Sequence, residues 1–139
     1  METTEQTNRI GLVTLPISVM TYDIDYAQIV HNAVYIRWLE DLRTALIRDA
    51  YSIEELLAGG ISPILTRTTI EYRLPVRFGD DVLGAMWVAE LERTRWTIEA
   101  EITVGGELRT WARQQGYFAD LKKLRPVRVP ERLRALWRA

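Results

Sequence analysis

The stretch from Tyr22 to Trp38, YDIDYAQIVHNAVYIRW, contains the change from an extended to a helical pattern on which the fold depends. Residues 12–25 predict a strand that is interrupted near Pro16, because side chains of different polarity alternate there. Residues 26–31 predict a short irregular or single-turn connection. From residue 33 to about residue 48, apolar side chains recur at three- and four-residue steps, which predicts an amphipathic helix.

The sequence after this helix predicts one more helix and then a series of strands. Ser52, followed three residues later by Glu55, forms the capping-box pattern of a short helix over residues 52–58, and Gly59-Gly60 is a typical end for it. Four strands follow, over residues 64–73, 82–92, 96–104 and 107–119. Residues 78–81 predict a turn, and Gly105-Gly106 is a strong signal for a two-residue hairpin.

This order of elements predicts an α+β fold with one domain over residues 1–139. The long helix must bury its apolar face, and an antiparallel sheet with one apolar face is the available partner. We therefore expect a curved antiparallel sheet wrapped around one central helix, with Asn32 as the N-cap of that helix. The edge strands of such a sheet stay unpaired in a single copy, which predicts at least a dimer.

The composition excludes several kinds of site. The chain has no cysteine, which excludes disulfides, thiolate nucleophiles and cysteine-ligated zinc, and it fits a reducing compartment. His31 is its one histidine, so a zinc site of two or three imidazoles cannot come from one chain. Residues 1–9 carry two glutamates and no basic segment, and no apolar run is long enough to cross a membrane. We expect a soluble cytoplasmic protein with no membrane partner.

The C-terminal segment is basic, with seven Lys or Arg residues between positions 120 and 139 against Asp120 and Glu131. Such a run is typical of a solvated terminal segment, here with a short helix after Pro130. It could also attract an anionic nucleotide ligand. We expect no nucleic acid partner, because aromatic and basic residues do not interleave on a predicted face.

Asp25 combines two features that suit acyl chemistry. It lies at the end of the predicted strand, seven residues before Asn32 at the start of the long helix. The first N–H groups of a helix have no internal partners, so they can polarise a carbonyl and stabilise its oxyanion. A nearby carboxylate can attack that carbonyl or activate water. A capping or turn aspartate is the alternative, and Asp23 is either a structural partner or a second carboxylate.

Residues 23–35 resemble the signature Asp-x-Asp-x-x-Gly-x-Val-x-(His/Asn)-x-x-Tyr of the 4-hydroxybenzoyl-CoA thioesterase family and its Tol–Pal-operon relatives. Residues 72–80, YRLPVRFGD, and residues 125–133, RPVRVPERL, resemble that family's strand-and-turn motif and its usual ending. The resemblance extends over nearly the whole chain. It implies a hotdog fold, dimers that usually pair into homotetramers, an acyl-CoA substrate, and neither metal nor cofactor.

The resemblance also implies roles for individual residues. By position, Asp25 is the catalytic carboxylate, and Asn32 supplies the backbone N–H that polarises the thioester carbonyl. His31 is either a general acid near the leaving thiolate or a hydrogen-bonded loop residue. Gln28 stands where a glycine is usual, and Tyr26 where a proline or alanine is usual. The glycine serves a tight turn, so these departures affect the expected acyl group more than the chemistry.

Arg93 and Arg95 lie where the family has basic residues that meet the nucleotide phosphates of CoA, and guanidinium groups suit phosphates. Ordinary exposed strand arginines are the alternative. The resemblance thus implies hydrolysis of an acyl-CoA to a carboxylate and free CoA, with Asp25 as nucleophile or general base. A non-catalytic hotdog module that binds acyl-CoA or acyl-carrier protein is the alternative function.

Overall fold

The computed structural model describes residues 9–138, so most of the acidic N-terminal stretch considered above lies outside the described part. The elements follow the predicted order, with a short extra strand near the C-terminus that the sequence did not predict. They are β1 (Ile10–Ile17), the 3-10 helix η1 (Thr21–Asp23), α2 (Val34–Arg48), α3 (Ile53–Gly59), β2 (Ile61–Tyr72), β3 (Val82–Leu91), β4 (Arg95–Val104), β5 (Glu107–Asp120), β6 (Arg125–Val127) and α4 (Glu131–Leu136).

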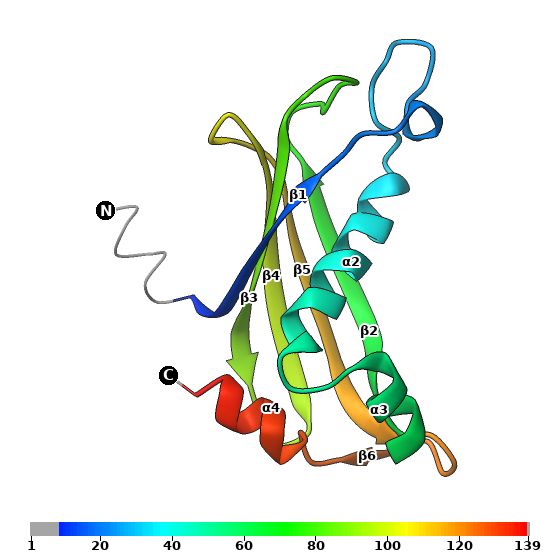
Figure 1. Cartoon of the computed structure of the whole chain (residues 1–139), viewed down its shortest axis with the longest axis vertical. Helices are drawn as coiled ribbons and strands as arrows, with labels where there is room; N and C mark the ends of the chain where they lie inside the picture. The colour runs from blue at the N-terminus through cyan, green and yellow to red at the C-terminus, as the bar shows by residue number, and fades with distance from the viewer. Residues whose placement is uncertain (1–8, 139) are drawn as a thin grey trace.

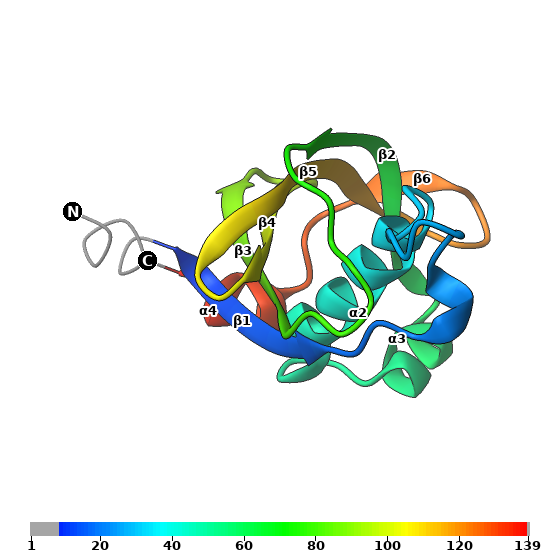
Figure 2. The ribbon, with the colours of Figure 1, turned by 90° about the horizontal axis from the view of Figure 1, so that it is seen from above.

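The strands form one antiparallel sheet in the order β1-β3-β4-β5-β2, and β6 pairs with β5. Figures 1 and 2 show that the sheet curls around α2, with α3 and α4 near the C-terminal end of that helix. The predicted α+β architecture with one central helix is therefore confirmed. β1 and β2 are the two edge strands of the described sheet.

The core forms between the apolar face of α2 and the inner face of the sheet. Tyr35, Trp38, Leu39, Leu42 and Leu46, which recur at helical spacing, are all at most 5% exposed. They share one buried cluster with residues that alternate along β3 and β4, among them Met86, Val88, Ile98, Ala100 and Ile102. The two periodicities read from the sequence thus meet in a single core.

Two glycines allow close approaches within this core. A Cβ at Gly84 of β3 would come within 2.8 Å of Ile17 and 3.1 Å of Leu42, so glycine lets α2 lie close to the sheet. A Cβ at Gly116 of β5 would collide with the carbonyl oxygen of Ile64 and the ring of Trp96. The Trp96 ring therefore lies directly against the backbone of β5.

The first strand is shorter than predicted. β1 ends at Ile17, which pairs with Val82, the first residue of β3, so an extension beyond Ile17 has no partner strand. Instead, the carboxylate of Asp23 accepts a hydrogen bond from the Met20 N–H (2.9 Å) and closes η1. The prediction that the strand continues to Asp25 was wrong, because local side-chain hydrogen bonding replaces the ladder there.

The start of α2 also differs from the prediction. The N-cap is Ala33 rather than Asn32, and no side chain caps the helix. The Val34 N–H already donates to the carbonyl of His31 (3.0 Å), which closes a turn over the residues just before the helix.

The signals for α3 and the hairpin are confirmed. The hydroxyl of Ser52 accepts from the Glu55 N–H, the Glu55 carboxylate accepts from the Ser52 N–H, and Gly60 ends the helix at φ +68°. Gly105 and Gly106 both have positive φ angles, as a tight hairpin turn of this kind requires. Within residues 9–138 no helix has both the length and the apolar character to span a bilayer.

Candidate active site

Asp25 lies in a tight hairpin that connects η1 to α2. Ile24 and Val30 form an isolated antiparallel bridge, and the Asp25 N–H donates to the carbonyl of Ile29 (3.0 Å). Gln28 closes the turn, with its N–H on the carbonyl of Asp25 (2.9 Å) and a φ of +63°. Gln28 therefore adopts the left-handed conformation that glycine adopts most readily, at the position where the resemblance expects a glycine.

The two carboxylate oxygens of Asp25 have different surroundings. Oδ1 accepts hydrogen bonds from the N–H groups of Ala27 (2.9 Å) and Ile29 (3.1 Å), so it holds the hairpin. Oδ2 has no hydrogen bond or ion pair with any residue in the described part of the chain, and the side chain is exposed. One oxygen thus fixes the loop, while the other is accessible to water or a ligand.

A second loop fixes the position of this hairpin. The Val30 N–H donates to the carbonyl of Val76 (2.9 Å), and the Phe78 N–H donates to the carbonyl of Gln28 (3.0 Å). Both partners lie in the loop over residues 73–81, between β2 and β3. Figure 1 shows the two loops side by side at the N-terminal end of α2.

Asn32 lies exposed at the mouth of α2. Within residues 9–138 its N–H donates to no group, and its carbonyl accepts from the hydroxyl of Tyr72 (3.1 Å). Tyr72 in turn packs edge-to-face on Tyr35, with 5.2 Å between ring centroids. Burial raises the pKa of both tyrosines, so both stay protonated at neutral pH.

A shallow hollow of about 170 Å³ opens beside this helix mouth. Its lining includes Ile29, Asn32, Tyr35, Tyr72 and Pro75, but Asp25 is not part of it. Tyr35 ends the motif of residues 23–35 and Tyr72 opens that of residues 72–80, yet neither tyrosine was predicted to lie at the site. Their places in these motifs were the available signal.

Asp23 has the contacts of a structural residue. It is 4% exposed, its carboxylate caps η1, and its carbonyl accepts the His31 N–H (3.0 Å). Arg37 of α2 lies 3.4 Å from its Oδ1. The imidazole of His31 is exposed and has no hydrogen bond or ion pair among residues 9–138. Asp23, Asp25, His31 and Asn32 thus lie in one short segment before α2, and the hairpin folds this segment back on itself.

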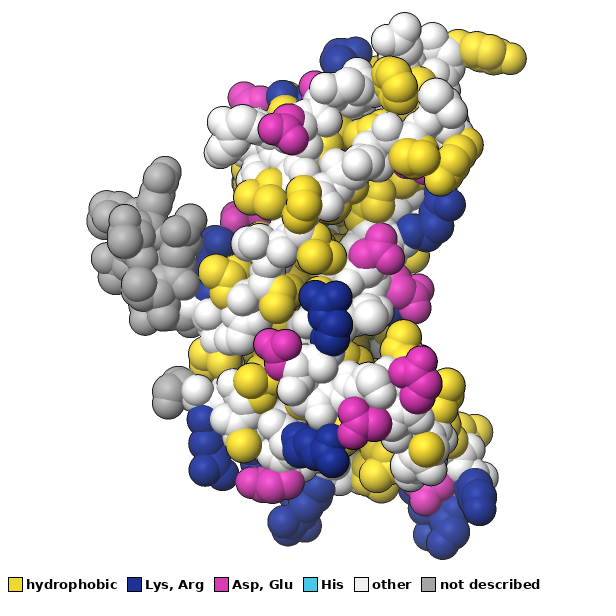
Figure 3. All heavy atoms as spheres, viewed as in Figure 1, with side chains coloured by type: hydrophobic (Ala, Val, Ile, Leu, Met, Phe, Trp, Pro, Cys, Tyr) yellow, Lys and Arg dark blue, Asp and Glu magenta, His cyan; other side chains and the backbone are white. Residues whose placement is uncertain are grey.

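The end of β3 and the start of β4 lie at the opposite end of α2 from the Asp25 hairpin (Figure 1), so Arg93 and Arg95 lie there too. Arg93 lies in the β3–β4 turn rather than in the strand, and Arg95 is the first residue of β4. Both are exposed, and Figure 3 shows other Lys and Arg side chains at this same end of the molecule. A 15-residue helix is about 22 Å long, so one chain does not bring these arginines to Asp25.

No group of three or more potential metal-ligating side chains occurs in the part of the chain that the structure describes. The polar groups at this end of α2 include the exposed Asp25 carboxylate, the Asn32 N–H and the Asp23–Arg37 ion pair.

Comparison with known proteins finds a family model and a bacterial protein that each match most of this chain. The model of the family described as "Thioesterase-like superfamily" matches residues 19–136. "Putative acyl-CoA thioesterase YneP" of Bacillus subtilis (strain 168) is 29% identical over 115 residues, which cover 80% of this chain and 82% of that protein.

Solved structures share the fold at lower sequence identity. A hypothetical protein from Thermus thermophilus has a TM-score of 0.80 at 24% identity, covering 88% of this chain and 95% of its own. The 1,4-dihydroxy-2-naphthoyl-CoA thioesterase from Synechocystis has a TM-score of 0.82 at 16% identity, covering 90% and 94%. A hypothetical protein from Staphylococcus aureus, solved in complex with CoA, has a TM-score of 0.85 at 16% identity, covering 92% and 82%.

Proposed function

The chain belongs to the thioesterase-like superfamily, and from this premise we propose that it hydrolyses acyl-CoA thioesters to a carboxylate and free CoA. The observation that carries the proposal is the extent of the family match, because residues 19–136 include the Asp25 hairpin, α2 and the helix mouth. The name of the Bacillus relative supports the acyl-CoA class of substrate. We also propose that the chain is related to the 4-hydroxybenzoyl-CoA thioesterases within this superfamily, as the resemblance of residues 23–35 implies.

In the proposed chemistry, the free Oδ2 of Asp25 accepts a proton from water while the water oxygen attacks the thioester carbon. The Asn32 N–H, which has no partner in the described chain, stabilises the oxyanion. Collapse of the tetrahedral intermediate breaks the C–S bond, and the CoA thiolate takes up the proton. In the alternative route, Oδ2 attacks the carbonyl directly, and water then cleaves the resulting anhydride. Neither route uses a metal or cofactor.

The hairpin geometry supports a shared substrate position for Asp25 and Asn32. Ile29 lies opposite Asp25 across the hairpin and also lines the hollow beside Asn32. A thioester placed at the edge of this hollow would therefore have the helix mouth on one side and the hairpin on the other. Its carbonyl oxygen would point toward the Asn32 N–H.

We further propose a homodimer or a dimer of dimers, in which Arg93 and Arg95 bind the phosphates of CoA held by a neighbouring subunit. The separation of these arginines from Asp25 within one chain supports contact across subunits rather than within one. His31, exposed beside Asn32, is the candidate general acid for the leaving thiolate.

Release of CoA thiol from a panel of acyl-CoAs tests the proposed activity. The chain has no cysteine, so a thiol reagent detects the product without protein background. We expect Asp25→Asn to lower the rate by roughly 10²–10⁴-fold, the usual effect of removing a catalytic base. The asparagine carbonyl can still accept the Ala27 and Ile29 N–H groups, so the hairpin should persist.

Asp81→Asn is the matched control, because Asp81 is an exposed aspartate in the turn before β3. Equal rates in wild type and Asp25→Asn would contradict the assignment. Single-turnover hydrolysis in water labelled with heavy oxygen tests the direct route, because label found in Asp25 requires an anhydride that water opens at the aspartyl carbon.

A non-catalytic acyl-CoA or acyl-carrier-protein binding module is the second candidate function. It is favoured by the two hydrogen bonds on Asp25 Oδ1, which give this residue a structural role, and by its absence from the lining of the hollow. Tight binding of acyl-CoA with no thiol release in wild type would establish this function instead.

A further inference from the structure

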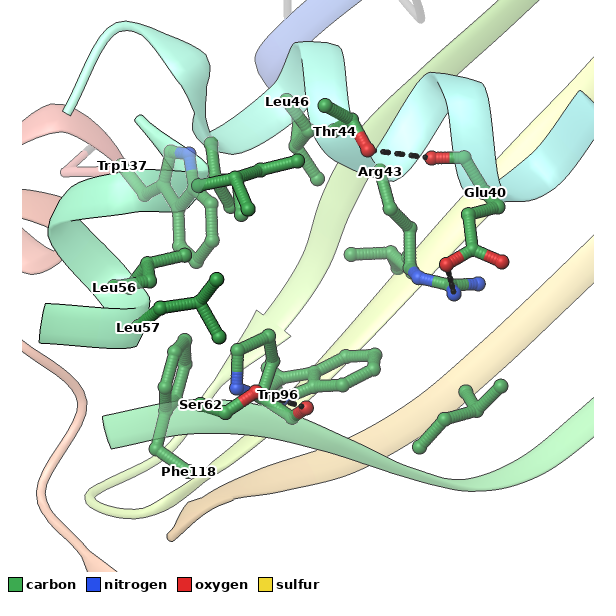
Figure 4. Close-up of a pocket in the computed structure, with 15 residues that line it drawn as sticks. Glu40, Arg43, Thr44, Leu46, Leu56, Leu57, Ser62, Trp96, Phe118 and Trp137 are labelled. Carbon is green, nitrogen blue, oxygen red and sulfur yellow. Dashed lines mark hydrogen bonds and ion pairs between the residues drawn. The ribbon is translucent and has the colours of Figure 1, made fainter. Parts of the chain in front are cut away.

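A second cavity lies beneath the C-terminal half of α2 (Figure 4), and Asp25 is not among the residues that line it. Its volume is about 240 Å³, and α2, α3, the inner face of the sheet and the segment after α4 enclose it. Most of its lining is apolar and includes Leu46, Ile47, Leu56, Trp96, Phe118 and Trp137. An apolar cavity of about 150 Å³ binds benzene, so this one has room for about ten non-hydrogen atoms.

Arg43 is the cation in this lining. Figure 4 shows its side chain descending from α2 toward the sheet, and the side chain is 23% exposed. Nη1 donates to Oε1 of Gln114 (2.7 Å), a residue that is 1% exposed. Gln114 Nε2 donates to the hydroxyl of Thr68 (3.1 Å). A buried amide therefore holds the guanidinium in a fixed orientation.

The counter-ion of Arg43 is Glu40, three residues earlier on α2, and this ion pair is long. Glu40 Oε1 lies 3.8 Å from Nη2, beyond the roughly 2.7–2.9 Å of a charge-assisted hydrogen bond, and the Glu40 side chain is 70% exposed. Burial lowers the pKa of Arg43, which reflects the unfavourable desolvation of its charge. An anionic oxygen that made a direct hydrogen bond to the guanidinium, in place of this long contact with Glu40, would therefore be bound favourably.

The rings of Trp96 and Trp137 line the same cavity. Their indole N–H groups are buried within the protein, where the Trp137 Nε1 lies against Gly11 of β1, so the guanidinium of Arg43 is the polar donor on which the site depends. A ligand with an apolar body and one anionic group complements these apolar walls and the Arg43 guanidinium.

We propose that this cavity binds an amphipathic carboxylate, with its apolar body among the leucine and aromatic side chains and its carboxylate on the Arg43 guanidinium. The planar fork of arginine matches the two oxygens of a carboxylate. The site does not depend on the proposed hydrolysis, because its lining includes neither Asp25 nor Asn32, which precede the N-terminal end of α2.

Isothermal titration of the full chain with octanoate and with octanamide tests the proposal. The two probes have similar size, but one carries the carboxylate charge and the other is neutral. For wild type we expect octanoate to bind at least about tenfold more tightly than octanamide. Octanoate should also shift the tryptophan fluorescence, because Trp96 and Trp137 line the cavity.

Arg43→Met should remove this preference, lowering octanoate affinity by about tenfold or more while octanamide affinity stays within about threefold. Arg48→Met is the matched control, since Arg48 is an exposed arginine at the end of the same helix. Because Arg43→Met also removes the bond to Gln114, its melting temperature is measured first. Arg43→Lys keeps the charge and should retain the preference for octanoate in part.

Equal binding of the two probes by wild type, or an unchanged preference in Arg43→Met, would overturn the proposal. Asp25→Asn separates it from the proposed hydrolysis, because that variant should bind octanoate like wild type. If wild type hydrolyses acyl-CoA but shows no octanoate preference, only the cavity proposal fails. If octanoate binds as expected but no acyl-CoA is hydrolysed, only the proposed hydrolysis fails.

Discussion

The carboxylate of Asp25 holds the hairpin with one oxygen and leaves the other unpaired within the described chain. This arrangement determines the backbone conformation of the neighbouring residues. Oδ1 organises the N–H groups of Ala27 and Ile29, which forces the chain to turn back over few residues. The turn requires a left-handed residue, and Gln28 occupies that position at φ +63°. A glutamine there pays a steric penalty that a glycine avoids.

Gln28→Gly should therefore stabilise the fold by up to about 1 kcal/mol, with the relief of left-handed strain partly offset by the greater freedom of glycine in the unfolded chain. Urea unfolding of both proteins measures this difference. Gln28→Ala is the control, because alanine retains the Cβ. A glycine variant no more stable than the alanine variant would show that the turn is not strained.

The sequence identified Asp25, and it identified Gln28 as a departure at a glycine position. It gave no sign of the Arg43–Gln114 pair. Gln114 lies in the inner-facing row of β5, between Ala112 and Gly116, where alternation alone predicts an apolar residue. The burial of Gln114 is explained by its hydrogen bond with Arg43 of α2, and the sequence alone does not show that these two residues meet.

At the level of secondary structure, elements defined by local chemistry were predicted well. The Ser52 capping box and the Gly105-Gly106 hairpin each depend on a few neighbouring residues, and both formed as expected. The end of β1 was predicted poorly, because strand length depends on the partner strand. Alternation continued in the sequence to Asp25, but β3 offers no partner beyond Ile17.

α3 is joined to α4 by an ion pair whose pH dependence can be measured. Arg132 lies 2.7 Å from the Glu55 carboxylate, and this hydrogen bond lowers the pKa of Glu55 below its usual 4.5. Since the folded pKa lies below the unfolded one, the pair stabilises the protein above about pH 4.5 and loses this effect as the pH falls further. The melting-temperature difference between wild type and Glu55→Gln should shrink between about pH 6 and pH 3.

Glu54→Gln is the control for this measurement, because Glu54 is exposed on the same helix and has no ion pair in the described chain. A difference between wild type and Glu55→Gln that stays constant over the same pH range would contradict the pairing.

At the scale of the whole molecule, the sheet has two free edges of unequal length. β2 runs for 12 residues and β1 for 8, and each carries one proline, Pro63 near the start of β2 and Pro16 near the end of β1. The longer edge presents more unpaired backbone groups to a second copy, so we expect subunits to join along β2.

Light scattering should therefore give a mass of two or four times 16.1 kDa. Leu65→Lys on β2 should lower that mass, whereas Leu12→Lys on β1 should leave it unchanged; the two leucines are 39% and 40% exposed. A monomeric wild type, or a lower mass only for Leu12→Lys, would exclude the β2 interface.

The sequence predicted the wrapping of the sheet around α2, because only one apolar surface was available to cover that helix. The separation of Arg93 and Arg95 from Asp25 could also have been predicted from the sequence. In an antiparallel meander successive turns alternate between the two ends of the sheet, and the 73–81 loop already lies at the Asp25 end.

The hydrogen bonds between the Asp25 hairpin and the 73–81 loop couple the evolution of two segments that are far apart in the sequence. They join backbone to backbone, at Val30 with Val76 and at Gln28 with Phe78, so they tolerate changes of side chain but not of loop length. An insertion or deletion in either loop would displace the other. A chimera that borrows one loop from a relative should therefore borrow both, and lineages that differ in the length of one loop should differ in the other.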